Sequence, residues 1–251
     1  MRIVPVIDLM GNLVVHAIAG KRSDYRPVKS VLTSQSSPEK VGSALFEKLR
    51  ATVVYVADLD AIAGAAPGWG VYQRIAGCGL KLWIDAGVSS PDRADEFRSR
   101  HEDFDCIDRV IVGLESINSP HALIQTLSVI GRDRCTFSLD LSQGVPLTDS
   151  DAWAGYSAIQ IGQTAVEAGV NSIIVLDLAH VGTGRGIRTL DLCHQLRSRW
   201  PEITLVAGGG VRNLCDLRDL EMAGCDAALI ASALHNGSLS LSALEDAGHT
   251  F

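Results

Sequence analysis

The sequence predicts an α/β protein that forms a single (β/α)8 barrel. Short runs of aliphatic and β-branched residues alternate with segments of helical periodicity along the whole chain. The length of 251 residues fits one large barrel. An open, doubly wound sheet is the weaker alternative, because no Gly-x-Gly-x-x-Gly follows the first expected strand, Ile3–Ile7.

The first half of the chain supplies four strands of this barrel. After Ile3–Ile7, the segment Val14–Ile18 extends a hairpin-like excursion and Gly20–Ser37 forms a long polar loop. A helix follows Pro38, where apolar residues recur at helical spacing. The other strands and helices expected in this half are strands Val53–Ala57, Leu80–Ile84 and Arg109–Val112, a short helix through Val71–Ile75 and a charged helix after Pro91.

The second half repeats the alternation. Its expected helices are Pro120–Ile130, Ala158–Ala168, Thr189–Arg199 and one that begins near Leu214. Its expected strands are Cys135–Leu139, Ser172–Leu176, Thr204–Ala207 and Ala227–Ile230.

The two halves also resemble each other in sequence. Ile3–Asp8 resembles Thr136–Asp140, and Leu82–Val88 resembles Leu205–Val211, at an offset of about 120 residues. A duplicated half-barrel explains such an offset. We therefore expect one domain over residues 1–251, with half-barrels at about 1–130 and 131–251.

Composition excludes several classes of function. The net charge of −7 argues against general binding of nucleic acid or an anionic membrane. The six cysteines are scattered without a Cys-x-x-Cys pair, which favours reduced thiols in a cytosol over disulfides or zinc. No apolar run predicts a membrane span, and a strand starts too early for a signal peptide. We expect a cytoplasmic protein, a monomer or small homo-oligomer, whose partner is a small phosphorylated metabolite.

Three consecutive glycines, Gly208, Gly209 and Gly210, separate a strand from a helix. The free N–H groups at a helix start suit a phosphate, and in barrels of this kind the turns after the last two strands usually hold one. The next strand ends at another small-residue turn, Ala231-Ser232. The alternative is that both turns need small residues for their geometry alone.

Aspartates follow many of the expected strands: Asp8, Asp58, Asp60, Asp85, Asp140 and Asp177. Carboxyl ends of barrel strands converge on one mouth. Asp8 and Asp140 end the first and fifth strands, so they are expected to face each other as a general acid and base. The alternatives are helix caps or loop hydrogen bonds, and a Mg²⁺ site. We predict neither a cofactor nor a metal ligand set.

Cations near the mouth are needed for a phosphate to bind there. The loop after the first strand supplies Lys21, Arg22 and Arg26, and the far side supplies Arg185, Arg188 and Arg212. Solvated surface charge is the alternative for many of them. His16 and His180 are candidates to titrate near neutrality, although a lone histidine is more often a packing or surface residue.

Several motifs resemble the histidine-biosynthesis barrel family. They are Pro-Val-Ile-Asp-Leu (5–9), Val-Ala-Asp-Leu-Asp (56–60), Ser-Leu-Asp (138–140), Val-Ala-Gly-Gly-Gly-Val (206–211) and Asp-Ala-Ala-Leu-Ile-Ala-Ser (226–232). This family comprises the phosphoribosyl-formimino carboxamide ribotide isomerase and the cyclase subunit of imidazole glycerol phosphate synthase. The resemblance covers nearly the whole chain. It implies a barrel of two repeats, two phosphate sites, and aspartates on strands one and five that act as acid and base, which are Asp8 and Asp140 here.

The chain also departs from the family pattern. The family's first phosphate site uses Gly-Gly-Gly after strand three, where this chain has Asp85-Ala86-Gly87, and an aspartate there would repel a phosphate. Leu176 and His16 stand where the isomerase has a threonine and an arginine. Val181-Gly182-Thr183 replaces Asp-Gly-Thr, and Ala231-Ser232 looks more like the cyclase. The second phosphate site is expected at Gly182, Thr183, Gly208, Gly209, Gly210, Ala231 and Ser232. The candidate substrate contacts are His16, Arg22, Asp58, Asp85 and Asp177.

Three hypotheses follow for the function. The first is an isomerase of Amadori or aldose–ketose type that acts on a singly phosphorylated sugar or aminosugar. The second is the histidine-pathway isomerase itself with a rearranged first phosphate site. The third is a barrel that binds a phosphorylated ligand without turnover. The segment 20–28 also resembles divergent paralogues of the isomerase, some of them associated with methanopterin-linked one-carbon metabolism, which leaves a lyase, cyclase or isomerase acting on a monophosphate as a further option.

Overall fold

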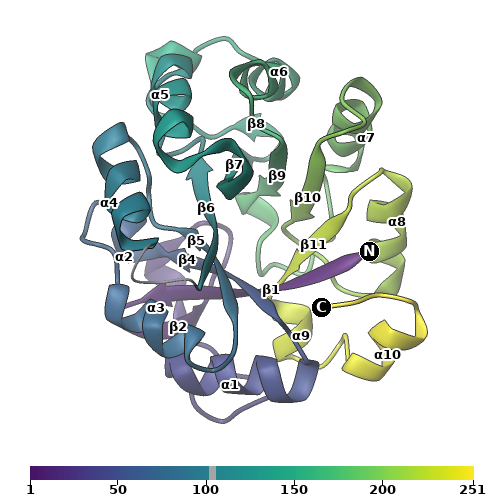
Figure 1. Ribbon diagram of the computed structural model, residues 1–251. Helices are drawn as coiled ribbons and strands as arrows, with labels where there is room; N and C mark the ends of the chain where they lie inside the picture. Colours follow the sequence, from purple (N-terminus) through teal and green to yellow (C-terminus); the bar gives the residue numbers. More distant parts are fainter. Residues whose placement is uncertain (102–105) are drawn as a thin grey trace.

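Eight parallel strands close into a barrel in the computed structural model, which describes residues 1–101 and 106–251 (Figure 1). The ring closes because β11 pairs in parallel with β1, so that Ile3 lies beside Ala228. The predicted fold class is therefore confirmed. Around the ring the strands are β1 (Arg2–Met10), β4 (Val53–Asp58), β5 (Lys81–Asp85), β6 (Ile107–Gly113), β7 (Cys135–Ser142), β9 (Ser172–Asp177), β10 (Thr204–Gly208) and β11 (Ala227–Ile230).

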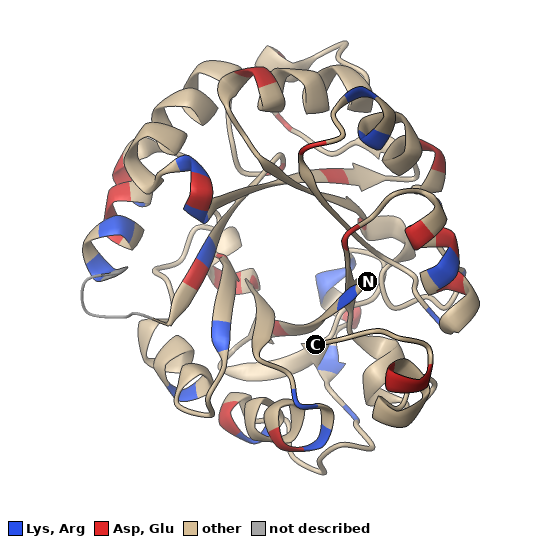
Figure 2. Ribbon diagram, turned by 45° about the vertical axis from the view of Figure 1, so that its right-hand side comes forward, with Lys and Arg blue, Asp and Glu red and all other residues tan. Residues whose placement is uncertain are grey.

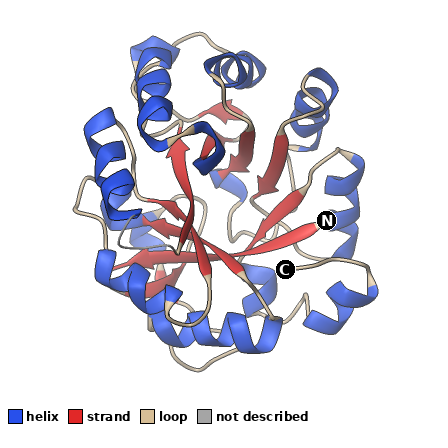
Figure 3. Cartoon of the chain, in the orientation of Figure 1, coloured by secondary structure: helices blue, strands red, loops and turns tan. Residues whose placement is uncertain are grey.

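Helices surround the strands on the outside (Figure 3). Their starts follow capping rules: Ser119 and Asn213 precede helices and accept hydrogen bonds from backbone N–H groups in the first turn. The helices are α1 (Pro38–Leu49), α2 (Leu59–Ile62), α3 (Trp69–Ala76), α4 (Pro91–His101), α5 (Pro120–Ile130), α6 (Ala158–Ala168), α7 (Leu190–Arg199), α8 (Leu214–Met222), α9 (Ser232–His235) and α10 (Leu241–Asp246), with 3₁₀ turns η1 (Arg22–Asp24), η2 (Arg132–Arg134), η3 (Asp151–Trp153) and η4 (Leu178–His180).

Two barrel strands continue past the ring as hairpins. β1 pairs with β2 (Leu13–His16), which pairs in turn with β3 (Arg26–Pro27), and β7 pairs with β8 (Val145–Pro146). Both turns have two residues of positive φ: Gly11 at 57° and Asn12 at 63°, and Gln143 at 54° and Gly144 at 81°. Such turns follow the right-handed twist of the strands they join. Only the first hairpin was expected from the sequence.

The period of two along each strand decides which side chains enter the barrel. On β1, Val4 and Val6 belong to the apolar layer inside the ring, whereas Ile3 and Ile7 pack outward against the helices. Asp8 has the parity of Val4 and Val6. The inner layer is formed by Val4, Val53, Tyr55, Ala57, Trp83, Ile111, Ile174, Val206, Ala227 and Leu229.

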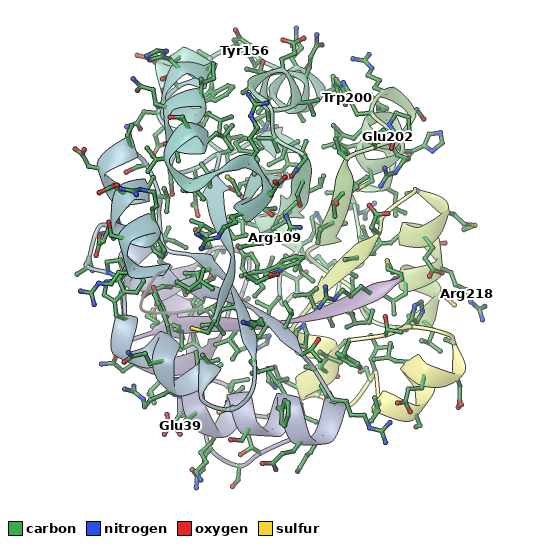
Figure 4. All side chains as sticks on the ribbon, in the orientation of Figure 1. Glu39, Arg109, Tyr156, Trp200, Glu202 and Arg218 are labelled. Carbon is green, nitrogen blue, oxygen red and sulfur yellow. The ribbon has the colours of Figure 1, made fainter. Side chains whose placement is uncertain are left out.

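A polar network lies at the amino-terminal end of the barrel, below the inner layer. Arg109 sits 5.5 Å above the ring of Trp83 and donates to Thr136 Oγ1 at 3.3 Å. Thr136 Oγ1 in turn donates to Ser172 Oγ at 3.2 Å. In Figure 4 Arg109 lies near the strands at the centre, whereas Tyr156 and Arg218 lie at the periphery. Polar side chains therefore fill this end of the barrel.

Charged residues concentrate on the outer helices (Figure 2). Within the part of the chain that the structure describes, no helix is both long and apolar enough to cross a bilayer. The division into half-barrels at about residue 130 stays a prediction.

Candidate active site

A cavity of about 700 Å³ lies at the carboxyl ends of the strands. Most of the predicted site residues line it: Asp8, His16, Arg22, Asp85, Asp140, Gly182, Thr183, Gly209, Gly210, Ala231 and Ser232. Asp58, Asp177 and Gly208 are not among the lining residues. This end of the barrel is where active sites of this fold are found.

The ring order places four features a quarter-turn apart around the cavity. Asp8 lies near the carboxyl end of β1 and Asp140 near that of β7. These are the first and fifth strands of the closed ring and lie opposite each other. Asp85 ends β5, the third strand, and lies opposite the glycine turn that follows β10, the seventh. A ligand held between the glycine turn and Asp85 therefore passes between Asp8 and Asp140.

Asp8 and Asp140 differ in their surroundings. Burial raises the pKa of Asp8 to about 7. Asp140 accepts a hydrogen bond from Ser138 Oγ at 2.6 Å and lies near the backbone N–H of Glu115, at 3.5 Å. Its pKa is raised well above its usual range, first by burial and then by the Glu115 and Asp85 carboxylates. Both aspartates are therefore harder to ionise near neutral pH than a free aspartate.

Asp85 is a third carboxyl group of this cavity, and only 6% of its surface is exposed. Tyr55 OH donates to Asp85 Oδ2 at 3.0 Å. Burial, and then the charge of Glu115, raise the pKa of Asp85 to about 7. Gly113 leaves room for two carboxyl groups, because a Cβ there would lie 3.0 Å from Asp140 Oδ2 and 3.9 Å from Asp85 Oδ2.

Glu115 and Tyr55 line the same side of the cavity and were not identified from the sequence. Glu115 lies two residues after the end of β6, so a search for acidic residues at strand ends does not find it. Tyr55 was interpreted as part of an apolar run. The period of two along β4 could have shown that its side chain points into the barrel. Burial raises the pKa of Glu115, and the guanidinium of Arg22 opposes that rise. Among the described residues, no group of three or more His, Cys, Asp or Glu side chains is arranged to hold a metal ion.

The opposite side of the cavity carries small residues and exposed backbone. Gly209 and Gly210 have φ values of 84° and 102°. A Cβ on Gly209 would lie 2.8 Å from the Asp177 carbonyl oxygen, and one on Gly210 would collide with the carbonyl of Gly186. Geometry alone thus requires these glycines, and both also line the cavity. Gly208 instead packs under Leu229 and Leu176.

Histidine and serine side chains complete this side. His16 Nε2 lies 3.0 Å from Ser232 Oγ. His235, which the sequence analysis missed, lies 2.9 Å through Nδ1 from Ser30 Oγ, and burial lowers its pKa to about 4. Lys29 and Arg212 also line the cavity. This end therefore offers hydrogen-bond donors and positive charge to an anion.

A strap, defined as residues 17–31, crosses the mouth. Its backbone N–H groups at Ala19 and Val31 donate to the carbonyls of Val181 at 2.9 Å and His235 at 2.8 Å. Arg22 Nη1 donates to the carbonyl of Leu59 at 3.1 Å. The strap thus touches the loops after β4, β9 and β11.

Asp58 and Asp177, both expected as substrate contacts, lie outside the cavity lining, and their contact with a substrate stays a prediction. Both share the parity of residues that pack outward, Val56 and Val175, so their carboxylates turn away from the lumen. Asp58 accepts hydrogen bonds from Ala61 N, Gly68 N and Tyr72 OH, the last at 2.6 Å. Asp177 accepts from the N–H groups of Gln143, Gly144 and Ala179. Both carboxylates organise loops, which is the alternative that the sequence left open.

A family model described as "Histidine biosynthesis protein" matches residues 2–240. The chain belongs to the histidine biosynthesis protein family. Within it, the chain is similar to a protein of Methanocaldococcus jannaschii named only as uncharacterised, at 31% identity over 242 residues, 96% of each chain.

Two relatives that are named as isomerases also match nearly the whole chain. The 1-(5-phosphoribosyl)-5-((5-phosphoribosylamino)methylideneamino)imidazole-4-carboxamide isomerase of Thermus thermophilus is 27% identical over 246 residues, which cover 96% of this chain and 97% of that one. The isomerase of the same name from Leptospira biflexa is 28% identical over 249 residues, 96% and 95% of the two chains. The recognition of the family from sequence motifs is therefore confirmed.

Proposed function

We propose that this histidine-biosynthesis family member is an isomerase of Amadori or aldose–ketose type that acts on a singly phosphorylated sugar or aminosugar. The phosphate is held by the turns at Gly182–Thr183, Gly209–Gly210 and Ala231–Ser232. Asp8 and Asp140 act on the carbon atoms of the substrate that lie between them. Membership of a family whose named relatives are isomerases supports the reaction class.

The observation that carries the proposal is the crossed arrangement of the cavity. The line from the glycine turn to Asp85 crosses the line from Asp8 to Asp140, because β1, β5, β7 and β10 are evenly spaced in the ring. An anion tethered at one wall thus brings a short carbon chain between two carboxyl groups. This is the geometry that acid–base catalysis on adjacent carbons needs.

The raised pKa values support one assignment of the two roles. Asp140, whose pKa is raised well above its usual range, enters as the acid and donates to the ring oxygen as the C1–O bond breaks. Asp8, with a pKa of about 7, is the base that removes the C2 proton, which gives an enol or enamine. Protonation at C1 and loss of the proton on the C2 hydroxyl complete the isomerisation. C1 is reduced and C2 oxidised within one molecule, so no external redox partner is required.

Hydrogen exchange tests the proposal. We expect the protein to incorporate solvent deuterium at C2 or C1 of a matching aldose or aminoaldose monophosphate, observed by NMR. The Asp8→Asn variant should lose exchange by about 10³-fold or more, while an exposed carboxylate on α7, changed in Asp191→Asn, serves as the charge-matched control. Equal exchange in the Asp8→Asn variant would refute the assigned base.

Anion binding without exchange would favour the third hypothesis, a barrel that binds a ligand without turnover. Calorimetry with inorganic phosphate measures the anion site separately, and Ser232→Ala should weaken that binding. Ser232 lines the cavity beside His16, so the variant removes a side-chain donor without filling the pocket.

The histidine-pathway isomerase activity is the second candidate, and the full-length similarity to named carboxamide isomerases favours it. Rescue of a histidine auxotroph that lacks this isomerase is the test. Failure despite good expression would reject it and leave the monophosphate isomerase. Action in the cytoplasm, an assembly no larger than a small homo-oligomer and a place in methanopterin-linked one-carbon metabolism remain hypotheses from the sequence.

A further inference from the structure

The mechanism above leaves one buried carboxyl group without a role. Asp85 ends β5 on the wall opposite the glycine turn, and its surface is 6% exposed. Tyr55 OH fixes its Oδ2 atom at 3.0 Å, whereas Oδ1 has a longer contact, 3.3 Å, with Gly87 N. Asp85 therefore has two hydrogen-bond donors within the protein but no charged partner, and a buried carboxylate is costly unless its charge is paired.

Among the residues that the structure describes, no Lys or Arg side chain forms an ion pair with the carboxyl groups of this wall. The ion pairs found among residues 1–101 and 106–251 do not include Asp85, Asp140 or Glu115. Arg22 approaches Glu115 from the strap, but its guanidinium donates to the carbonyl of Leu59. Asp85 and Asp140 are buried, whereas Glu115 is exposed. Buried carboxylates without a counter-ion are costly, so the wall would gain from a ligand that brings positive charge.

The two ends of the cavity therefore have opposite character. The end near Gly209 has the glycine backbone, His16 and Lys29, together with Arg212, whose guanidinium already pairs with Asp216, while the end at β5 has Asp85 and Glu115 with Asp140 beside them. A second phosphate at the β5 end would meet these carboxylates and be repelled.

We propose that Asp85 determines substrate specificity: it binds a protonated amine at the end of the substrate that lies away from the phosphate. The proposal rests on the proposed function, because it takes the phosphate site near Gly209 and Ser232 as the other anchor. The substrate class is thus an amino-bearing monophosphate. Bisphosphates are excluded by the same residue.

An ammonium group fits better than a hydroxyl group for two reasons. It has three donors and a full charge, so it can bind Asp85 Oδ1 and the Glu115 carboxylate together. Its positive charge also favours the ionised form of Asp85, whose pKa is raised by burial and then by the charge of Glu115, so binding should release protons at neutral pH. A hydroxyl group satisfies hydrogen bonds but leaves the charge unopposed.

Calorimetry on the full-length protein tests the proposal with defined probes. The probes are inorganic phosphate and sets of alkyl, ω-aminoalkyl and α,ω-bisphosphate compounds of matched and increasing chain length. In the wild type we expect the best aminoalkyl phosphate to bind about tenfold or more tightly than the alkyl phosphate of equal length. The bisphosphate should bind more weakly than the alkyl phosphate.

The Asp85→Asn variant should lose the preference for the amine and keep its affinity for inorganic phosphate. The Asp191→Asn variant, with the same change of charge on the exposed surface, should keep both. An amine preference that survives in Asp85→Asn, or a wild type that binds alkyl and aminoalkyl phosphates equally, would overturn the proposal. The wild-type comparison decides even if the variant does not fold.

Failure of the proposed function has a different signature. In that case neither inorganic phosphate nor alkyl phosphate binds to the wild type. Alkylamines and alcohols of equal length then probe the β5 end alone, and the proposal stands only if the amine binds better and Asp85→Asn abolishes that difference.

Discussion

Replacing Asp85 by asparagine should make the protein more stable, by an amount that grows with pH. The pKa of Asp85 is raised from 3.8 to about 7 in the folded protein, chiefly by burial. A carboxyl group whose pKa is higher in the folded than in the unfolded protein makes its full contribution to stability below the unfolded pKa, where it is protonated in both states. That contribution is lost as the pH rises through the folded pKa. Asparagine keeps the size and an acceptor for Tyr55 OH but does not ionise.

The magnitude follows from the shift. About three pKa units correspond to about 4 kcal/mol at 1.36 kcal/mol per unit. The free energy of unfolding of the variant, minus that of the wild type, should therefore increase by about 4 kcal/mol between pH 4 and pH 8. Loss of the Asp85 charge also lowers the pKa of Asp140, because Asp85 is one of the charges that raise it. This change further increases the stability of the variant relative to the wild type at high pH.

Urea unfolding of both proteins across this pH range measures the difference, with slopes that verify two-state behaviour. Subtraction removes the contributions of Asp8 and other groups that titrate in both proteins. The Asp191→Asn variant, whose exposed carboxylate has no such burial, should show a difference that stays near zero. A flat difference for Asp85→Asn would refute the claim that this carboxyl group is buried without a counter-ion.

Three further predictions concern catalysis and loop structure. Exchange of substrate hydrogen should rise with pH through about 7 as Asp8 ionises and fall at higher pH as Asp140 ionises, measured as a pH–rate profile. Gly182→Ala should cost about 2 kcal/mol or more in unfolding experiments, because φ is 67° and the new Cβ would collide with the Ala17 carbonyl. Tyr72→Phe should cost about 1.5 to 3 kcal/mol, because it removes the hydroxyl that donates to Asp58 at 2.6 Å.

The two substitutions, Gly182→Ala and Tyr72→Phe, each have a matched control. Gly184 has a similar φ of 66° but open space around its Cβ position, so Gly184→Ala should cost less than Gly182→Ala. Tyr156 is 41% exposed, so Tyr156→Phe should be nearly neutral beside Tyr72→Phe. Equal costs within either pair would contradict the packing argument, and a pH–rate profile without an acid limb near 7 would contradict the role of Asp8.

The fold was predictable because apolar runs and helical periodicity repeat so regularly. The helix Ala158–Ala168 and the strand Ala227–Ile230 have the bounds expected from the sequence. The short β7–β8 hairpin was not predictable from apolar periodicity, because its turn is only Gln143-Gly144 and β8 has two residues.

The aspartates at strand ends were predictable from the sequence, but the direction in which each side chain points was not predicted. All strand-end aspartates were treated alike, so Asp58 was expected beside Asp8. Asp8 is in step with the inward-facing residues of its strand, whereas Asp58 is in step with the outward-facing ones. Counting in steps of two from Tyr55 or Val6 would have separated them. Glu115 and His235 reach the cavity through turns whose paths depend on tertiary packing, so no local pattern marks them.

Asp85 also bears on how such a barrel changes its ligand during evolution. Aspartate and glycine codons differ by a single base, and the family resemblance puts a glycine at this place in barrels that take two phosphates. A point mutation would thus remove the negative wall while Tyr55 and Gly113 leave the space open. Because Ala86 also stands where the family has glycine, restoring the Gly-Gly-Gly turn would require two such point mutations and no rebuilding of the scaffold.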